Sequence, residues 1–165
     1  MSLISHIRLM YDYTYWAHRL VWDKSILALT DEQFTRPLDY SMGSIHHQVV
    51  HTLSAEWIWF SRMHGANPTA MLNPADYPTR ADVRAKWDEV ESMVRGYLAT
   101  LTEDALMQPL VYKSTTGKPD TQPVGILLMH VANHGTDHRA QMLAMLHGLG
   151  APTVEQDLIY YLRRR

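Results

Sequence analysis

Histidine is the residue type through which this sequence could carry out chemistry. The chain has ten histidines and no cysteine, and His130, His134 and His138 follow one another at intervals of four residues. In an α-helix, a step of four residues drifts about 40° around the axis, so His134 and His138 can point at one ion from one face. Imidazole nitrogens are ligands for zinc, nickel, copper and iron(II). Two ligands are too few for a tight site, so a third must come from another segment.

A second group of histidines, His46, His47 and His51, can supply that third ligand. His51 shares a mostly apolar helical stripe with Ala55 and Ile58, which favours an inward position. His47 lies one turn nearer a loop, and the spacing leaves it open as the alternative. The competing interpretation is that these histidines are hydrogen-bonded core residues, and that the spacing of four arises by chance in a histidine-rich helix.

Several other kinds of site are not indicated. The sequence lacks the His-Glu-x-x-His motif of zincin proteases and the Glu-x-x-His motif of ferritin-like di-iron bundles. It also lacks the glycine-rich phosphate-binding loops and the Gly-x-Ser-x-Gly nucleophile motif. Without cysteine, disulfides, thiolate metal sites and iron–sulfur clusters are excluded.

Length and charge are those of an ordinary globular protein. The chain has 165 residues, of which 46% are hydrophobic, and a formal net charge of -2. We expect one domain over residues 1–165, and the charge argues against nucleic-acid binding through a basic surface.

Residues 1–10 carry His6 and Arg8 where a signal peptide needs an apolar run, and no segment has the length and apolarity of a membrane span. A cytoplasmic protein without membrane contact is therefore expected.

Capping signals and helical periodicity predict four long helices, over residues 3–29, 45–64, 80–101 and 123–147. Ser44 and Gly65 bound the second of them, Thr79 opens a capping box at the third, and Pro123 is expected in the first turn of the fourth. Three shorter pieces are expected: a capped helix from Thr30 to before Pro37, an extended arm without a sheet within 108–121, and a last helix capped within 153–156 and reaching Leu162. The pattern predicts an all-α four-helix bundle.

Longer motifs resemble the DinB/YfiT-like family. Residues 130–141 read His-x-x-Asn-His-x-x-x-His-Arg-x-Gln, and the other similar stretches are residues 11–17, 43–45, 56–57, 146–150 and 157–162. One departure is Ala140, where the family often has glycine. The resemblance implies a four-helix bundle of the DinB/YfiT-like type, commonly a homodimer, in which three histidines bind a divalent transition metal. These ligands fall on His51, His134 and His138, with His130 outside the set.

The resemblance also implies a class of function. Some relatives are metal-dependent transferases or isomerases that use low-molecular-weight thiols. We therefore expect a metal-dependent enzyme of the thiol S-transferase or a related, hydrolase-like type, acting on a small-molecule thiol. Nickel or zinc is the expected metal, with iron or manganese as alternatives. The competing hypotheses are a non-catalytic, damage-inducible metal-binding stress protein and a bundle dimer whose histidines are incidental.

Three more polar residues have two interpretations each. Glu56 could be a general base or could hold a histidine, whereas the simpler interpretation is a surface or interface carboxylate. Arg139 and Gln141 could orient ligands or contact a partner chain, whereas the simpler interpretation is solvent exposure.

The helix over residues 45–64 carries two apolar stripes, which are Val49, Leu53 and Phe60 on one and Ala55, Ile58 and Trp59 on the other. One position in a bundle buries one stripe, so the second stripe predicts a homodimer. The alternative is a central helix that is buried on most sides within one chain.

Overall fold

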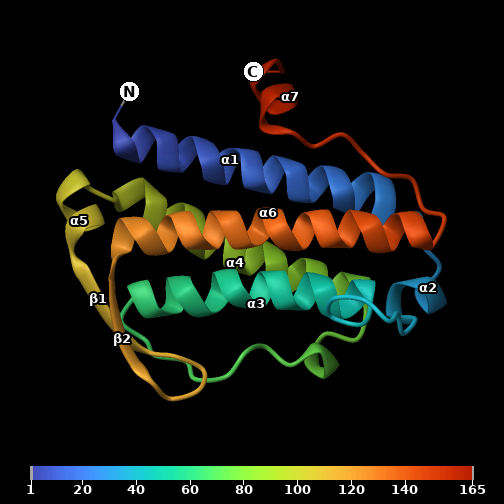
Figure 1. The fold of residues 1–165 in the computed structure, drawn as a ribbon, viewed down its shortest axis with the longest axis horizontal. Coiled ribbons are helices and arrows are strands. Elements are labelled where there is room, and N and C mark those ends of the chain that lie inside the picture. The colour runs from blue at the N-terminus through green and yellow to red at the C-terminus, as the bar shows by residue number, and fades with distance from the viewer. Residues whose placement is uncertain (1, 165) are drawn as a thin grey trace.

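Four long helices make up most of the chain in the computed structural model, which describes residues 2–164 (Figure 1). They are α1 (Leu3–Val21), α3 (Ile45–Met63), α4 (Arg80–Thr100) and α6 (Val124–Gly148). The shorter elements are η1 (Trp22–Ile26), α2 (Asp31–Thr35), η2 (Pro74–Asp76), α5 (Glu103–Met107), β1 (Pro109–Lys113), β2 (Pro119–Pro123) and α7 (Leu158–Leu162). The predicted helical bundle is confirmed, and a small two-stranded hairpin is added to it.

The long connection between α3 and α4 sets the directions of the helices. Residues 64–79 return along α3, where the Leu72 amide donates to Ser54 Oγ at 2.7 Å and His46 Nε2 lies 2.8 Å from the Tyr77 carbonyl oxygen. Consequently α3 and α4 run in the same direction, while α1 and α6 run in the opposite one (Figure 1). This order places α3 in contact with both α4 and α6.

Local capping signals set the starts of the helices. Thr30 and Thr79 form the predicted capping boxes, and Ser44 Oγ accepts a hydrogen bond from the His47 amide at 3.0 Å. Gly65 has a φ of 89°, a left-handed conformation that glycine adopts without the clash of a Cβ atom. These short-range interactions explain why the boundaries of α3 and the start of α4 follow from the sequence.

Three helix boundaries differ from the sequence-based expectation. The first helix ends at Val21 rather than residue 29, because the chain widens into the π turn η1, which buries both Trp22 and Ile26. Pro123 ends β2 and caps α6 from outside, so the helix begins one residue later. The last helix begins after Asp157 rather than within residues 153–156.

The expectation of an unpaired arm within residues 108–121 is wrong. β1 and β2 form an antiparallel pair in which Val111 lies opposite Thr121. Arg62 of α3 ties the hairpin to the bundle, because its Nη2 donates to the Lys113 carbonyl oxygen at 2.8 Å. Its guanidinium also lies 5.1 Å from the centre of the Tyr112 ring. Such contacts between distant segments leave no local pattern in the sequence.

Both apolar stripes of α3 are buried within one chain. Five of the six stripe residues are at most 5% exposed, namely Val49, Leu53, Ala55, Ile58 and Phe60. The premise that one stripe needs a second chain is therefore wrong, since α3 is covered by α4, α6 and the connection that follows it. The homodimer itself stays a prediction.

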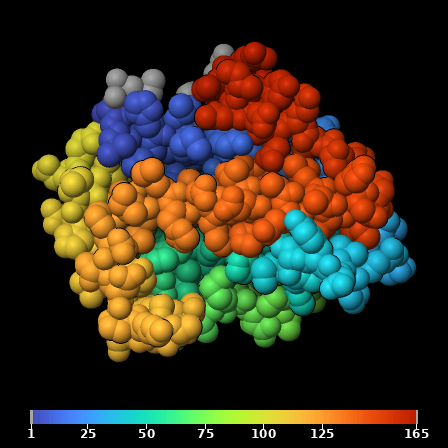
Figure 2. Space-filling view, viewed as in Figure 1, coloured from blue at the N-terminus to red at the C-terminus, as the bar shows by residue number. Residues whose placement is uncertain are grey.

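Helix α6 crosses the middle of the face shown in Figure 2, with α1 and the C-terminal segment along one side. The connection around residue 40, in cyan, and the hairpin lie along its other side. Among residues 2–164, no helix combines the length and apolarity that crossing a membrane requires.

Candidate metal centre

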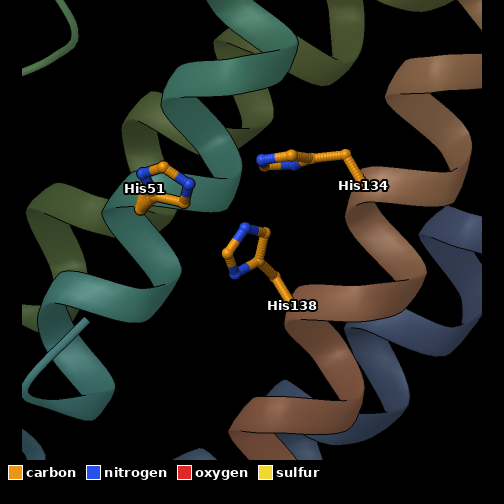
Figure 3. Close-up of side chains that lie close together, drawn as sticks. All are labelled: His51, His134 and His138. Carbon is orange, nitrogen blue, oxygen red and sulfur yellow. The ribbon is translucent and has the colours of Figure 1, made fainter. Parts of the chain in front are cut away.

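Three histidines converge between α3 and α6. His51 projects from α3, and His134 and His138 project from successive turns of α6 (Figure 3). One ring nitrogen from each lies within 4.8 Å of the others. The ring centres are 4.2 Å apart for His134 and His138, 4.5 Å for His51 and His138, and 5.2 Å for His51 and His134. All three side chains are half-buried, so the cluster could hold a metal ion that solutes can still reach.

The other nearby histidines lie outside this cluster. His47 is exposed, and its ring packs beside His46, whose own Nε2 lies against the Tyr77 carbonyl oxygen. His130 is also exposed, and it stands edge-on to Trp59 with ring centres 5.6 Å apart. The choice between His47 and His51, which the spacing left open, is thus made by the orientation of α3 against α6.

Burial keeps the clustered imidazoles neutral. Burial, together with the nearby His138, His51 and His130 rings, lowers the pKa of His134 to about 3. Burial is also the main cause of the lowered pKa values of His51 and His138. Only the neutral ring has a lone pair for a metal ion, so all three side chains are in the ligating form at neutral pH.

Gln48 is a residue of this site that the sequence analysis missed. Its side chain is fully buried, and its Nε2 lies 2.7 Å from His138 Nδ1 and 3.2 Å from Gln141 Oε1. Ser41 Oγ completes the cluster, 2.8 Å from Gln48 Oε1 and 2.7 Å from Gln141 Oε1. These contacts engage Nδ1 of His138 and leave its Nε2 on the side of the other two rings (Figure 3). In a ring that binds an ion through Nε2, Nδ1 carries the proton, so the amide of Gln48 would then present its oxygen rather than its nitrogen to Nδ1.

The only sequence signal for Gln48 is its position three residues before His51. Of the two interpretations of Gln141, the simpler one of solvent exposure does not hold, since Gln141 is partly buried and contacts Gln48, which itself contacts His138.

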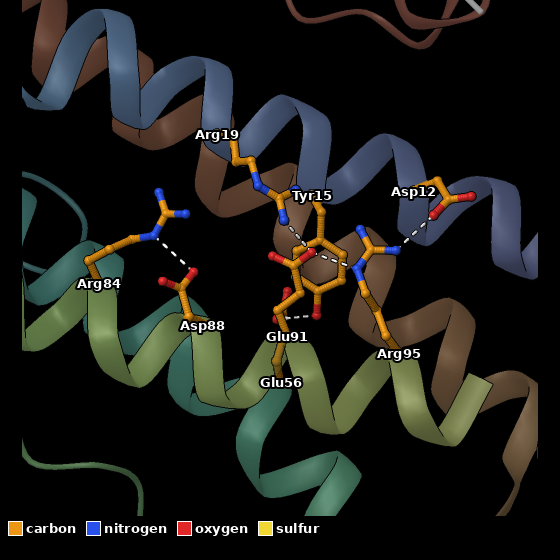
Figure 4. Close-up of polar contacts among 8 residues, drawn as sticks. All are labelled: Asp12, Tyr15, Arg19, Glu56, Arg84, Asp88, Glu91 and Arg95. Atoms are coloured by element: carbon orange, nitrogen blue, oxygen red, sulfur yellow. Dashed lines mark hydrogen bonds and ion pairs between the residues drawn. The ribbon is translucent and has the colours of Figure 1, made fainter. Parts of the chain in front are cut away.

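Glu56 and Arg139 are core residues, which corrects the simpler interpretation of each as a surface position. They are 3% and 1% exposed. Glu56 does not hold a histidine. Its Oε2 accepts a hydrogen bond of 3.0 Å from the Tyr15 hydroxyl (Figure 4). Arg139 donates from Nη2 to the Tyr13 hydroxyl at 3.1 Å and from Nε to Gln156 Oε1.

A second carboxylate, Glu91 of α4, is buried next to Tyr15 (Figure 4). It forms ion pairs with Arg19 of α1 and, at 2.6 Å, with Arg95 of its own helix. The charge of Glu91 is therefore balanced by two arginines, whereas Glu56 forms no ion pair within residues 2–164 and accepts a hydrogen bond from Tyr15.

Comparison with known proteins shows which family has this sequence and fold. The sequence profile of the DinB family matches residues 3–164. The chain belongs to the DinB family. It is 25% identical over 158 residues to Protein DinB of Bacillus subtilis (strain 168), which covers 93% of this chain and 91% of that protein. A DinB-like protein from Bacillus cereus ATCC 10987 has the same fold, with a TM-score of 0.58, 20% identity and coverage of 93% and 95% of the two chains.

The environment of Glu56 predicts a pH dependence of the stability of this DinB family member. Burial is the main cause of a pKa of Glu56 raised to about 7; the charge of Glu91 acts in the same direction, while the Tyr15 hydrogen bond and the charge of Arg139 act against it. A glutamate in an unfolded chain titrates near 4.3. Between about pH 4.3 and 7, the folded protein keeps a proton that the unfolded chain has lost, so the free energy of unfolding falls as the pH rises.

The Glu56→Gln variant should lose this dependence, because glutamine is neutral throughout. Urea unfolding of wild type and variant should show that their stability difference changes by roughly 3–4 kcal/mol between about pH 4 and pH 8, in favour of the variant at high pH. The matched control is Glu155→Gln at an exposed position. A constant difference between wild type and Glu56→Gln would show that Glu56 ionises normally in the folded protein.

Proposed function

We propose that His51, His134 and His138 bind one divalent transition metal ion. The observation that carries this proposal is the convergence of three ring nitrogens, from segments more than eighty residues apart, within 4.8 Å. The neutral state of the rings and the buried Gln48 contact to His138 support it. A set of nitrogen ligands suits nickel or zinc, with iron or manganese as alternatives.

We further propose that this member of the DinB family is a metal-dependent enzyme of the low-molecular-weight-thiol transferase or a related type. Three protein ligands leave a coordination position for substrate, the arrangement typical of catalytic rather than structural sites. A metal ion bound there would lower the pKa of a thiol or water and stabilise developing negative charge. The chain's own contribution is to hold the imidazoles neutral and fixed. The resemblance described from the sequence supports thiol chemistry as the class of reaction.

The surroundings of His134 suit a small organic substrate. The His130 ring lies 6.0 Å from that of His134, and Trp59 joins His130 to Tyr112 of the hairpin, with ring centres 4.8 Å apart for the last pair. These aromatic groups form an edge beside the cluster, where the carbon skeleton of a thiol or its electrophilic partner can pack without displacing a ligand.

Metal binding should depend on each clustered histidine. Each of the variants His51→Ala, His134→Ala and His138→Ala leaves two ligands. We expect Gln48→Leu, which removes a partner of a ligand, to lower the affinity for zinc or nickel roughly 10- to 100-fold. The three histidine variants should lower it more. Competition with a chromogenic chelator measures affinity, and plasma mass spectrometry measures stoichiometry. Metal should also raise the melting temperature of the wild type but not of the His→Ala variants.

The controls for this experiment are His47→Ala and His130→Ala, which should keep one metal ion per chain. Retention of metal by His51→Ala, with loss in His47→Ala, would make His47 the third ligand. Retention in all five histidine variants would refute the three-histidine site.

Catalysis is tested by a screen of low-molecular-weight thiols with electrophilic small molecules. The wild type loaded with nickel or zinc should form a carbon–sulfur product, and His134→Ala should lose this activity in the same metal-containing buffer. Mass spectrometry of the product identifies the reacting pair. A metal-loaded wild type that turns over none of the pairs would favour the non-catalytic metal-binding alternative.

We also propose a homodimer, on the basis of the DinB resemblance and of apolar groups on the face shared by α1, α6 and α7. Leu3 and Met129 are 50% and 58% exposed and line a groove with Met10 and Leu158. A second copy would cover this apolar surface.

Light scattering at micromolar concentration should give a mass of twice the 19.0 kDa of one chain. The Met129→Glu variant, which places a charge on this surface, should have a mass closer to that of the monomer. A monomeric wild type would contradict the proposal.

A further inference from the structure

The side-chain amide of Gln48 has a direction that backbone groups on both of its sides fix. Its Oε1 lies 3.3 Å from the amide nitrogen of Met42, and its Nε2 lies 3.3 Å from the carbonyl oxygen of His138. A backbone N–H can only donate, and a carbonyl oxygen can only accept. With the side-chain amide turned around, like groups would face each other at both contacts. The oxygen of Gln48 therefore faces Met42, and its nitrogen faces α6.

This direction determines which nitrogen of His138 carries the proton. Gln48 Nε2 lies 2.7 Å from His138 Nδ1, so Nδ1 has to accept the hydrogen bond. In a neutral imidazole, the other nitrogen then holds the proton. That nitrogen, Nε2, lies on the side of His51 and His134 (Figure 3). The neutral His138 ring thus presents an N–H, rather than a lone pair, to the other two rings.

Ligation through Nε2 requires the opposite tautomer. With the proton on Nδ1, the His138 ring needs an acceptor at the position that Gln48 Nε2 occupies. The oxygen of the same amide reaches that position when the amide reverses. The arrangement that supports an ion at His138 is therefore different from the one that the Met42 and His138 backbone groups favour.

The partners of Gln48 differ in how they can accommodate this reversal. Ser41 Oγ, 2.8 Å from Gln48 Oε1, is a hydroxyl that can accept as well as donate. Gln141, whose Oε1 lies 3.2 Å from Gln48 Nε2, is a half-buried amide that can reverse together with Gln48. The His138 carbonyl oxygen lies within α6, where the helix supplies its own N–H partner. Only the Met42 N–H cannot change its role, so it loses its acceptor.

Met42 belongs to a tight loop over residues 38–43, just before α3. Within this loop, the Leu38 amide donates to the Gly43 carbonyl oxygen at 2.7 Å. Ser41 has a φ of 49°, a left-handed conformation that is strained for a residue with a Cβ atom and that persists where contacts hold it. Met42 is 37% exposed, so its released N–H can bond to water. The loop is therefore the segment that a reversal of Gln48 would loosen.

We propose that Gln48 is a positioning residue that sets the tautomer of His138, and that its amide reverses when a metal ion binds, which releases the Met42 N–H and loosens the loop over residues 38–43. The reversal rests on the metal site proposed above. The tautomer of the metal-free chain does not, so the two can fail separately.

The first test uses the metal-free chain. Long-range proton–nitrogen NMR correlations identify the protonated nitrogen of each imidazole, and we expect the proton of His138 on Nε2. The variant Gln48→Glu, which has the same shape but offers only acceptors to Nδ1, should move that proton to Nδ1. His46 is the internal control, because its Nε2 lies 2.8 Å from the Tyr77 carbonyl oxygen and should keep its proton in both proteins.

A proton on Nδ1 of His138 in the metal-free wild type would overturn the proposal. An unchanged tautomer in a folded Gln48→Glu variant would show that residue 48 does not set it. If that variant fails to fold, the wild-type tautomer and the zinc titration still decide the question.

The second test follows the wild type during titration with zinc. Hydrogen exchange of the Met42 amide, measured by NMR, should become faster in the zinc-loaded protein, because its acceptor has turned away. The amide of Val50, a buried residue within α3, should keep its protection and serves as the control. Unchanged exchange at Met42 with zinc bound would overturn the reversal. A chain that does not bind zinc would refute the metal site and the reversal together, whereas the tautomer assignment would still be decided by the metal-free spectra.

Discussion

The packing of α3 against α6 is the contact on which the candidate site depends. His134 and His138 share one helix face by spacing alone, but their third partner lies on α3, more than eighty residues earlier in the chain. The antiparallel arrangement of the two helices brings His51 level with the pair. It also brings Gln48, one turn before His51, into contact with His138 and Gln141. One helix interface therefore positions the histidines and the amides that orient one of them.

The same bundle encloses charged groups that need compensation. Glu91 lies near the rim and is paired with two arginines, whereas Glu56 and Arg139 lie deeper, with neutral hydroxyls and an amide as their direct partners. Burial of an ionised group is strongly unfavourable unless a partner or a proton removes the charge. The raised pKa of Glu56 is the expected response of a carboxyl group in such a position. Buried charged side chains therefore occur both beside the outer ion pairs of Glu91 and at Arg139, which directly follows His138.

Much of the helical architecture is readable from short-range signals. The capping boxes at Thr30 and Thr79, the Ser44 cap and the left-handed Gly65 each involve residues within four positions of one another, so a linear pattern contains the whole interaction. Features that rest on distant contacts were not predictable in this way. The hairpin is held to α3 by Arg62, and the π turn after Val21 lets two large side chains enter the core. Neither leaves a periodic signature.

For the site, the sequence by itself determined that His134 and His138 share a helix face, and the family motifs within it pointed to His51 as the third member. Tertiary structure decided the rest: that His51 rather than His47 faces the pair, that Gln48 contacts His138, and that Glu56 and Arg139 are internal. The physical reason is that helical periodicity fixes the angle between residues on one helix but not the rotation of that helix against its neighbours. That rotation is set by the joint burial of all the apolar faces in the bundle, and it determines which polar side chains meet.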